Sequence, residues 1–267
     1  MNLTNEMLEG REYTSVINKS GKGRIVFVCE HASNYIPESF HRLGLSETQL
    51  QSHIAWDPGA LSVAQSLAEI FDAPLVYSGI SRLMYDCNRP PGEPSSIALK
   101  SEMDDIPGNF NLSDSAINSR IQLIYEPFVQ AIDDITREQT ERNMSPSIVT
   151  IHSFTPLYHG KTREVEVGIL HDDDHRLADC FMANCDSEAP YVIRRNQPYG
   201  PADGVTHTLK ERAMPGNLPN VMIEMRNDLI QDEAGIEKMV NFLAGVLKPS
   251  IADCHLMKPS HNEGQSE

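Results

Sequence analysis

Three short apolar runs in this chain each end at a cluster of polar, chemically capable side chains. The runs and the residues that follow them are 25–29 before Glu30 and His31, 148–151 before His152, and 221–223 before Glu224. Short runs rich in β-branched side chains are typical of strands that are buried on both faces of a sheet. Because ligands of open α/β sheets bind beyond the carboxyl ends of the strands, the three clusters predict one shared site.

Helical periodicity alternates with these strands along the chain. Apolar side chains recur at intervals of three and four residues in the ranges 60–71, 113–142, 174–185 and 233–247, which is typical of amphipathic helices. Further strands are expected at 73–77, 165–170 and 192–193. Pro127 should kink or break the second helix. The alternation predicts an α/β fold, a three-layer α/β/α sandwich around a mostly parallel sheet.

The chain is expected to form one domain with a short segment on each side. Its 267 residues contain no linker near the middle, so residues 23–252 are assigned to a single catalytic α/β domain. Residues 1–22 contain several acids and no apolar run, which predicts an N-terminal extension and not a signal peptide. Residues 253–267 are polar and predict a mobile tail. Residues 90–110, rich in Pro, Gly, Ser and acids, predict a long loop, which in a compact domain is usually a functional lid or a disordered segment.

Composition argues against several classes of partner. The 22 basic and 38 acidic side chains give a formal net charge of −16 without a long basic run, which disfavours nucleic acid and anionic membranes. No stretch approaches the roughly 18 apolar residues of a membrane span. Five cysteines without paired spacing predict free thiols and, with no signal peptide, a cytoplasmic location. No glycine-rich phosphate loop follows a strand, so a nucleotide cofactor is not expected. A homo-oligomer stays possible.

Two histidines at the ends of different strands predict a catalytic zinc site. Imidazole is the commonest protein ligand for zinc, and a catalytic zinc typically takes three protein ligands. His31 and His152 would supply two of them and a carboxylate the third. Glu224 emerges from apolar neighbours that would raise its pKa and suit it to act as a general base. Alternatively, Glu224 pairs with Arg226 on the same side of the strand.

Other polar side chains predict a site for a small anionic molecule. Asn88 and Arg89 place an amide beside a guanidinium, which together could hold a carboxylate. Arg82 and Arg226 would add to this site or steady a developing oxyanion, although some of these arginines could simply balance nearby aspartates. The loop at 196–208 adds His207 as a candidate substrate contact.

Six segments, in this order, resemble the N-formylglutamate amidohydrolase family: CEHASNYIP, WDPGA, SRLMYDCNRPP, TIHSFTP, NQPYGPADGVTHT and EMRND. The ordered set runs from about residue 26 to residue 228 and is far more specific than any single segment. The resemblance implies a zinc exopeptidase-like fold, similar also to aspartoacylase, with a mixed sheet between helices and a metal at the strand ends. It further implies metal ligands at His31 and His152, a base at Glu224 and a substrate-carboxylate site at Asn88 and Arg89.

The third metal ligand departs from the pattern of zinc exopeptidases. Those enzymes commonly place a ligating Glu three residues after the first His, whereas this chain has Asn34 there. An amide oxygen is a poor zinc ligand. Asp57 is the preferred replacement and Glu30 the second choice. Asp57 also precedes the helix at 60–71, so a helix N-cap is an alternative and compatible role.

The expected function is therefore metal-dependent hydrolysis of a small molecule, an N-formyl or other short N-acyl amino acid with a free carboxylate, similar to N-formylglutamate. Zn²⁺ or another divalent metal would be the cofactor. One rival is a metal-free thiol hydrolase that uses Cys29 as nucleophile and His31 or His152 as base. Another is a ligand-binding homologue that has lost the metal and the activity.

Overall fold

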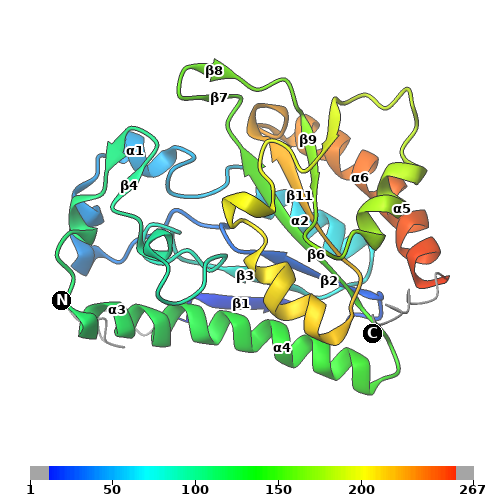
Figure 1. Ribbon diagram of the computed structural model, residues 1–267, viewed down its shortest axis with the longest axis horizontal. Helices are drawn as coiled ribbons and strands as arrows, with labels where there is room; N and C mark the ends of the chain where they lie inside the picture. The colour runs from blue at the N-terminus through cyan, green and yellow to red at the C-terminus, as the bar shows by residue number, and fades with distance from the viewer. Residues whose placement is uncertain (1–11, 257–267) are drawn as a thin grey trace, which may run out of the picture.

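A seven-stranded mixed sheet forms the centre of the protein in the computed structural model, which describes residues 12–256 (Figure 1). In sheet order the strands are β1 (Thr14–Ile17), β3 (Leu75–Ser78), β2 (Ile25–Cys29), β6 (Ser147–Phe154), β11 (Asn220–Arg226), β9 (Val167–Leu170) and β10 (Ile193–Arg195). β1 is antiparallel to β3 and β9 is antiparallel to β11, whereas the other neighbours are parallel. The expected mostly parallel sheet is confirmed.

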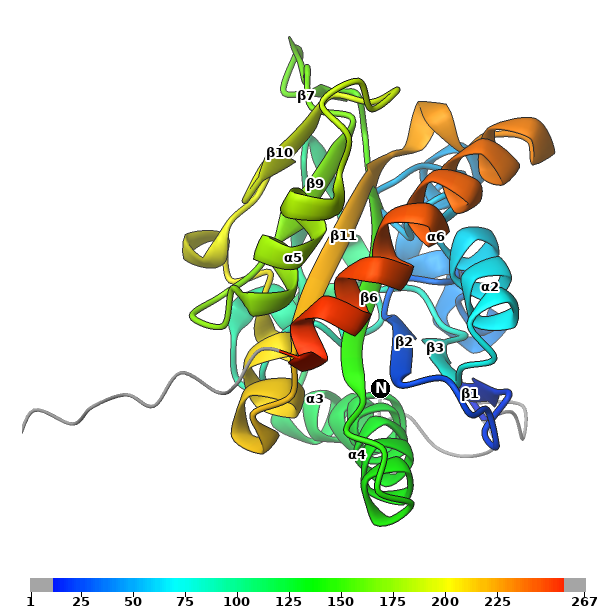
Figure 2. The same cartoon turned by 90° about the vertical axis from the view of Figure 1, so that its right-hand side faces the viewer.

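Helices cover both faces of the sheet (Figure 2). One face carries α2 (Ala60–Ile70), α5 (Arg176–Asn184) and α6 (Glu233–Leu256), and the other carries α3 (Asp114–Arg120) and α4 (Glu126–Glu141). Successive strand residues point to opposite faces, so Phe27 packs with the α2 side while Val26 and Val28 pack with the α4 side. The α/β sandwich of three layers follows from this double burial.

One helix is interrupted near the expected proline, and another extends beyond its expected end. The helix expected over 113–142 is divided by a π-helical turn at Ile121–Tyr125, and Pro127 lies in the first turn of α4. Because proline has no N–H and its ring collides with the carbonyl four residues earlier, a wider turn at this position relieves the clash. α6 extends to Leu256, with Pro249 inside it, instead of ending near residue 247.

The two flanking segments also take part in the fold where the structure describes them. The expected N-terminal extension contributes β1, which pairs with β3 along its whole length. Residues 253–256 of the expected tail continue α6, and the remainder of that tail lies outside the described residues. Between residues 12 and 256, no helix combines the length and the apolar character that a membrane span requires.

Short elements connect the layers around the site. The long loop predicted at 90–110 contains the hairpin β4 (Lys100–Ser101) and β5 (Asp104–Asp105), and a second hairpin consists of β7 (Leu157–Tyr158) and β8 (Lys161–Thr162). The remaining short helices are Glu38–Gly44, α1 (Glu47–Gln51), Pro94–Ile97, Pro107–Asn109, Pro201–Asp203, Leu209–Ala213, Met214–Gly216 and Asn227–Leu229.

Candidate active site

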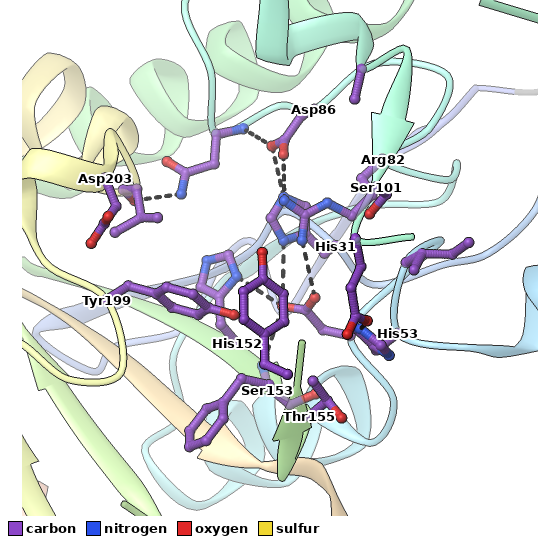
Figure 3. A pocket seen from close by; sticks show the side chains of 18 of the residues that line it. His31, His53, Arg82, Asp86, Ser101, His152, Ser153, Thr155, Tyr199 and Asp203 are labelled. Atoms are coloured by element: carbon purple, nitrogen blue, oxygen red, sulfur yellow. Dashed lines mark hydrogen bonds and ion pairs between the residues drawn. The ribbon is translucent and has the colours of Figure 1, made fainter. Parts of the chain in front are cut away.

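A cavity of about 580 Å³ lies where the carboxyl ends of β2, β3, β6 and β11 meet (Figure 3). Seven of the nine site residues predicted from the sequence line it: His31, Asp57, Arg82, Asn88, Arg89, His152 and Glu224. Arg226 and His207 are not among the lining residues. These seven residues therefore share one cavity at the strand ends, where the sequence predicted a common site.

Three buried side chains at the base of the cavity could hold a metal ion. Ligand atoms of His31, Asp57 and His152 all lie within 4.8 Å of one another. Asp57 Oδ2 lies 2.9 Å from His152 Nδ1 and 3.3 Å from His31 Nδ1, and it also accepts a hydrogen bond from the backbone N–H of Ser153. Two imidazole nitrogens and one carboxylate oxygen match the donor set of a catalytic zinc.

The outer nitrogen of each histidine faces a second carboxylate. His31 Nε2 lies 2.7 Å from Asp86 Oδ1, and His152 Nε2 lies 3.0 Å from Glu30 Oε2. In the metal-free protein each Nδ1 faces Asp57 as a hydrogen-bond donor, whereas with a metal bound a carboxylate beside Nε2 would keep the proton on Nε2 and leave Nδ1 for coordination, as in metal-ligating histidines. Glu30 therefore lies on the Nε2 side of His152, while Asp57 lies on the Nδ1 side of both rings.

A tight turn aims Asp57 at the histidines. The backbone N–H of Asp57 donates to the carbonyl of His31, and the N-cap of α2 is Gly59, in the left-handed region at φ 81°. A Cβ at Gly59 would press on the Ile230 carbonyl oxygen at 2.5 Å, so a side chain is excluded there. The N-cap role for Asp57 is thus wrong, and its carboxylate is free to serve the site. Asn34 lies away from the cluster, donating to the Leu50 carbonyl.

Burial and mutual charge set the protonation of the cluster. Burial and Arg82 oppose the charge on His31, but Asp86 and Asp57 outweigh them and raise its pKa. Burial likewise disfavours His152 carrying charge, yet Glu30 and Asp57 hold its pKa well above the ordinary value. Burial would raise the pKa of the Asp57 carboxyl, but the histidines bring it below the usual range. The cluster balances three buried acids with two imidazolium groups and Arg82.

Glu224 differs from these acids because it lacks a close partner. It stands opposite His152 in the β6–β11 register, and both point to the α4 face, since Ile151 and Ile223 pack on the other face. Its buried Oε2 has no hydrogen-bond partner among the described residues. Burial, reinforced by Asp57 and opposed by the histidines, raises the pKa of Glu224 to about 7. A carboxyl with this pKa is suited to proton transfer near neutrality.

The alternative in which Glu224 pairs with Arg226 is wrong. Arg226 Nε donates to Asp228 Oδ1 at 2.8 Å, and its Nη2 donates to Glu166 Oε1 at 3.2 Å. Arg226 therefore binds two acids outside the cavity and does not line the cavity itself. The raised pKa of Glu224 follows from the absence of such a pairing.

The predicted substrate-binding residues take different positions. Asn88 is saturated by the backbone, since its amide donates to the Val205 carbonyl and accepts from the N–H of Thr208. Arg89 Nη1 donates to the carbonyls of Asn88 and Gly204 at 2.9 Å, and the guanidinium lines the cavity. Asn88 thus holds the 204–208 loop in place.

Arg82 and His207 illustrate the same division between the cavity and its surroundings. Arg82 binds Asp86 Oδ2 at 2.6 Å, approaches Asp57 at 3.6 Å and lines the cavity. His207 Nε2 instead lies 2.8 Å from the hydroxyl of Tyr125, outside the cavity lining. Burial lowers the pKa of His207.

Sequence reasoning missed Asp86 and Arg163 as parts of the site. Asp86 binds His31, Arg82 and the N–H of Asn88, and its pKa is depressed against the effect of burial by Arg82 and His31. Its position after β3, in the segment SRLMYDCNRPP, was the available signal. Arg163 lines the cavity from the β7–β8 hairpin, where the sequence offers no periodicity that could reveal it.

Cys29 is on the wrong face of the sheet to serve as a nucleophile. It is completely buried in the core with α2, whereas His152 and Glu224 point to the opposite face. Burial, Asp57 and Glu30 raise the pKa of the Cys29 thiol well above its ordinary value, so the thiolate is suppressed. The chain's five cysteines are all free, as expected.

Proteins of known structure share this fold. A gene product of Agrobacterium tumefaciens of solved structure is 48% identical, has a TM-score of 0.90, and the match covers 93% of this chain and 98% of that chain. An N-formylglutamate amidohydrolase from Ralstonia eutropha JMP134 is 14% identical with a TM-score of 0.65, covering 92% of this chain and 100% of that one, and this likeness shows the fold alone. No curated protein matches.

A family model described as N-formylglutamate amidohydrolase matches residues 23–231. The matched segment contains all the strands that contribute to the cavity, together with the His31, Asp57 and His152 cluster and Glu224. Because the match spans well over half of the 267 residues, the chain belongs to the N-formylglutamate amidohydrolase family and is a hydrolase that acts on amide bonds.

Proposed function

We propose that this protein is a metal-dependent amidohydrolase that cleaves an N-formyl, or similarly short N-acyl, amino acid with a free carboxylate, an N-formylglutamate-like substrate. The observation that carries the proposal is the buried cluster of His31, Asp57 and His152, with the unpartnered carboxyl of Glu224 on the same face of the sheet. The family membership of the chain supports the same reaction class.

The cluster fits a divalent metal by the chemistry of its donors. His31 and His152 would bind through Nδ1 and Asp57 through a carboxylate oxygen, while Asp86 and Glu30 orient the two rings through Nε2. Zn²⁺ favours this mixture of imidazole and carboxylate. A metal at this position would lower the pKa of water and polarise the acyl carbonyl.

The protein's own residues would handle the protons and the substrate charge. Glu224 would take a proton from the attacking water and deliver it to the departing amine, because its raised pKa allows both steps near neutrality. Arg82 would face the developing oxyanion while Asp86 holds its guanidinium. Arg89 would bind the substrate's free carboxylate with the N–H groups that the Asn88 and Gly204 carbonyls do not use.

The test is metal analysis of the purified protein followed by hydrolysis assays on a panel of N-formyl and N-acetyl amino acids. We expect about one equivalent of divalent metal per chain, loss of activity with a chelator, recovery on adding Zn²⁺, and no effect of a thiol reagent. Inhibition by the thiol reagent alone would favour Cys29 chemistry. Absence of both metal and activity would favour the ligand-binding homologue. The cytoplasmic location and the homo-oligomer stay predictions.

A further inference from the structure

We propose that Thr208 is a positioning residue of the candidate metal site, and that its hydroxyl holds the Glu30 carboxylate against His152. The inference rests on the proposed function, because it concerns the orientation of the same two histidines. Thr208 does not line the cavity, so any effect that it has on the site must pass through other side chains.

Asn88 fixes the position of Thr208. The side-chain carbonyl of Asn88 accepts from the Thr208 N–H at 3.0 Å and lies 3.2 Å from the Thr208 hydroxyl. The backbone N–H of Asn88 donates to Asp86 Oδ1 at 2.9 Å, and the same oxygen lies 2.7 Å from His31 Nε2 (Figure 3). Thr208 is therefore connected, through Asn88, to the acid that orients His31.

Glu30 faces Thr208 from the other side. Its Oε2 lies 3.0 Å from His152 Nε2, and its carboxylate also interacts with the Thr208 hydroxyl. Within the part of the chain that the structure describes, neither oxygen of Glu30 makes a well-formed hydrogen bond. Glu30 and Thr208 are only 1% and 3% exposed, so solvent does not supply a donor. The hydroxyl of Thr208 is thus the group placed to complete the hydrogen bonding of Glu30.

The number of available protons favours this assignment. Thr208 has one hydroxyl proton to donate, and the side-chain carbonyl of Asn88 already accepts from the Thr208 N–H. A carboxylate is the stronger acceptor because it is charged. The terminal torsion of a glutamate is broad, so a second donor is needed to fix the direction of the Glu30 carboxylate and, with it, the ring of His152.

These contacts join both histidines in one buried ring of polar side chains. Asp57 lies between the two Nδ1 atoms and closes the ring on the metal side. The members, in order, are Asp57, His31, Asp86, Asn88, Thr208, Glu30 and His152. The loop at 196–208 thereby influences the spacing of the two Nδ1 atoms that would bind a metal. Removal of such an outer partner typically costs 10- to 100-fold in metal affinity.

The experiment measures Zn²⁺ affinity by competition with a chromogenic chelator in wild-type protein, Thr208→Val and Thr208→Ser. Valine keeps the shape of threonine and removes the hydroxyl, so Thr208→Val should bind Zn²⁺ at least about 10-fold more weakly. Thr208→Ser keeps the hydroxyl and should return to within about 3-fold of wild type. The matched control is Thr206→Val. Thr206 is buried in the same loop and donates to a carboxylate, Asp172, outside the metal cluster.

Thr206→Val should change the Zn²⁺ affinity by less than about 3-fold. Equal weakening by both valine variants would assign the effect to the stability of the loop and overturn the inference. Unchanged affinity in Thr208→Val would overturn it as well. Circular dichroism checks that each variant folds, and Thr208→Ala replaces the valine variant, with the same expectation, if that variant does not fold.

A second readout follows His152 in the metal-free protein. In protein with ¹⁵N-labelled histidine, the signal of the His152 Nε2 proton is identified by its loss in His152→Ala. The signal should be protected from solvent exchange in wild type and Thr206→Val, and shifted or lost in Thr208→Val. An unchanged signal in Thr208→Val would overturn the inference. If the wild-type protein binds no Zn²⁺, the metal-dependent proposal fails, and this signal alone still decides whether Thr208 positions His152.

Discussion

At the scale of single residues, the site contains acids of the same chemical type whose pKa values are shifted in opposite directions. Asp57, Asp86 and Glu30 lie against histidines or Arg82, and their pKa values are lowered despite complete burial. Glu224 is also buried, but its Oε2 has no hydrogen-bond partner within residues 12–256, and burial outweighs the nearby histidines and raises its pKa. Environments that separate the pKa values of neighbouring acids are typical of sites that transfer protons.

The first prediction concerns catalysis by Glu224. Glu224→Gln should reduce kcat by at least about a hundredfold, because the amide keeps the size of the side chain but cannot accept a proton. Metal content, measured by atomic absorption, should stay at the wild-type level, since Glu224 is outside the ligand cluster. A variant that turns over at the normal rate would remove Glu224 from the mechanism and leave the proton to another group.

The second prediction concerns stability and pH in the metal-free protein. The pKa of Glu224 is about 7 in the folded state and about 4.3 in an unfolded chain. Between about pH 4.3 and pH 7 the Glu224 carboxyl is therefore protonated in the folded state and ionised in the unfolded state. The free energy of unfolding therefore falls as pH rises through this range. The glutamine of Glu224→Gln does not ionise, so the stability of the variant does not fall in this way. Above about pH 7.5 the variant should be more stable than the wild-type protein by up to about 3 kcal/mol.

Urea titrations of both metal-free proteins at about pH 5 and about pH 8 measure this difference. The variant's relative stability must increase with pH. A difference that is independent of pH would mean that Glu224 ionises in the folded state as easily as in the unfolded chain.

At the scale of elements, strand β9 and the loop at 196–199 pack with their backbones in close contact. Gly168 in β9 stands opposite Glu224 of β11, and a Cβ there would overlap the carbonyl oxygen of Gln197. The glycine lets the loop at 196–199 lie directly on the sheet. This contact brings Tyr199 over the cavity, where it contacts Arg163.

The third prediction therefore concerns Gly168→Ala. The added methyl group must push the loop away from β9, which should cost about 1–3 kcal/mol of stability and raise KM through displacement of Tyr199. Gly245→Ala is the matched control, because Gly245 lies in α6 with open space around it. That replacement should stabilise the protein by up to about 1 kcal/mol. Denaturant unfolding and steady-state kinetics on both variants check the expectation, and equal stabilities would contradict it.

At the scale of the whole molecule, the candidate metal cluster is assembled from segments that are remote in the chain. His31 follows β2, Asp57 precedes α2 and His152 is within β6. Folding thus brings two imidazoles and several carboxylates into a small buried volume, where the histidines carry protons that balance the acids. A metal bound by the two histidines would have to replace those protons.

The fourth prediction is that Zn²⁺ uptake by the metal-free protein releases protons at pH 7. The pKa values of His31 and His152 are both raised, whereas coordination requires neutral imidazole. Calorimetric titrations in two buffers of different ionisation enthalpy measure the release, and the apparent affinity should increase with pH. His152→Ala should abolish tight binding, while His53→Ala, whose histidine pairs with Glu102 at the cavity rim, should not. Binding without proton release would contradict the assignment of these ligands.

The sequence by itself determined the layers, most strands and the general position of the site. Hydrophobic periodicity is a local property, so runs such as 25–29 and 221–223 identify strands without knowledge of their neighbours. The polar residues that follow them had to meet, because parallel strands end at the same edge. His31, His152 and Glu224 were found in this way.

Only the tertiary structure decided the partners of these side chains. Asn88 and Arg226 are polar groups next to site residues in sequence, yet they bind Thr208 and Asp228. No local sequence pattern identifies Arg163 as a site residue. It lines the cavity because the β7–β8 hairpin places it there. Hydrogen bonds and ion pairs depend on distances of a few ångströms between remote segments. Burial shifts the pKa values of charged side chains, and the spacing of residues in the sequence does not predict the size of these shifts. The chain's pattern therefore predicts which residues meet, whereas packing decides what each of them does.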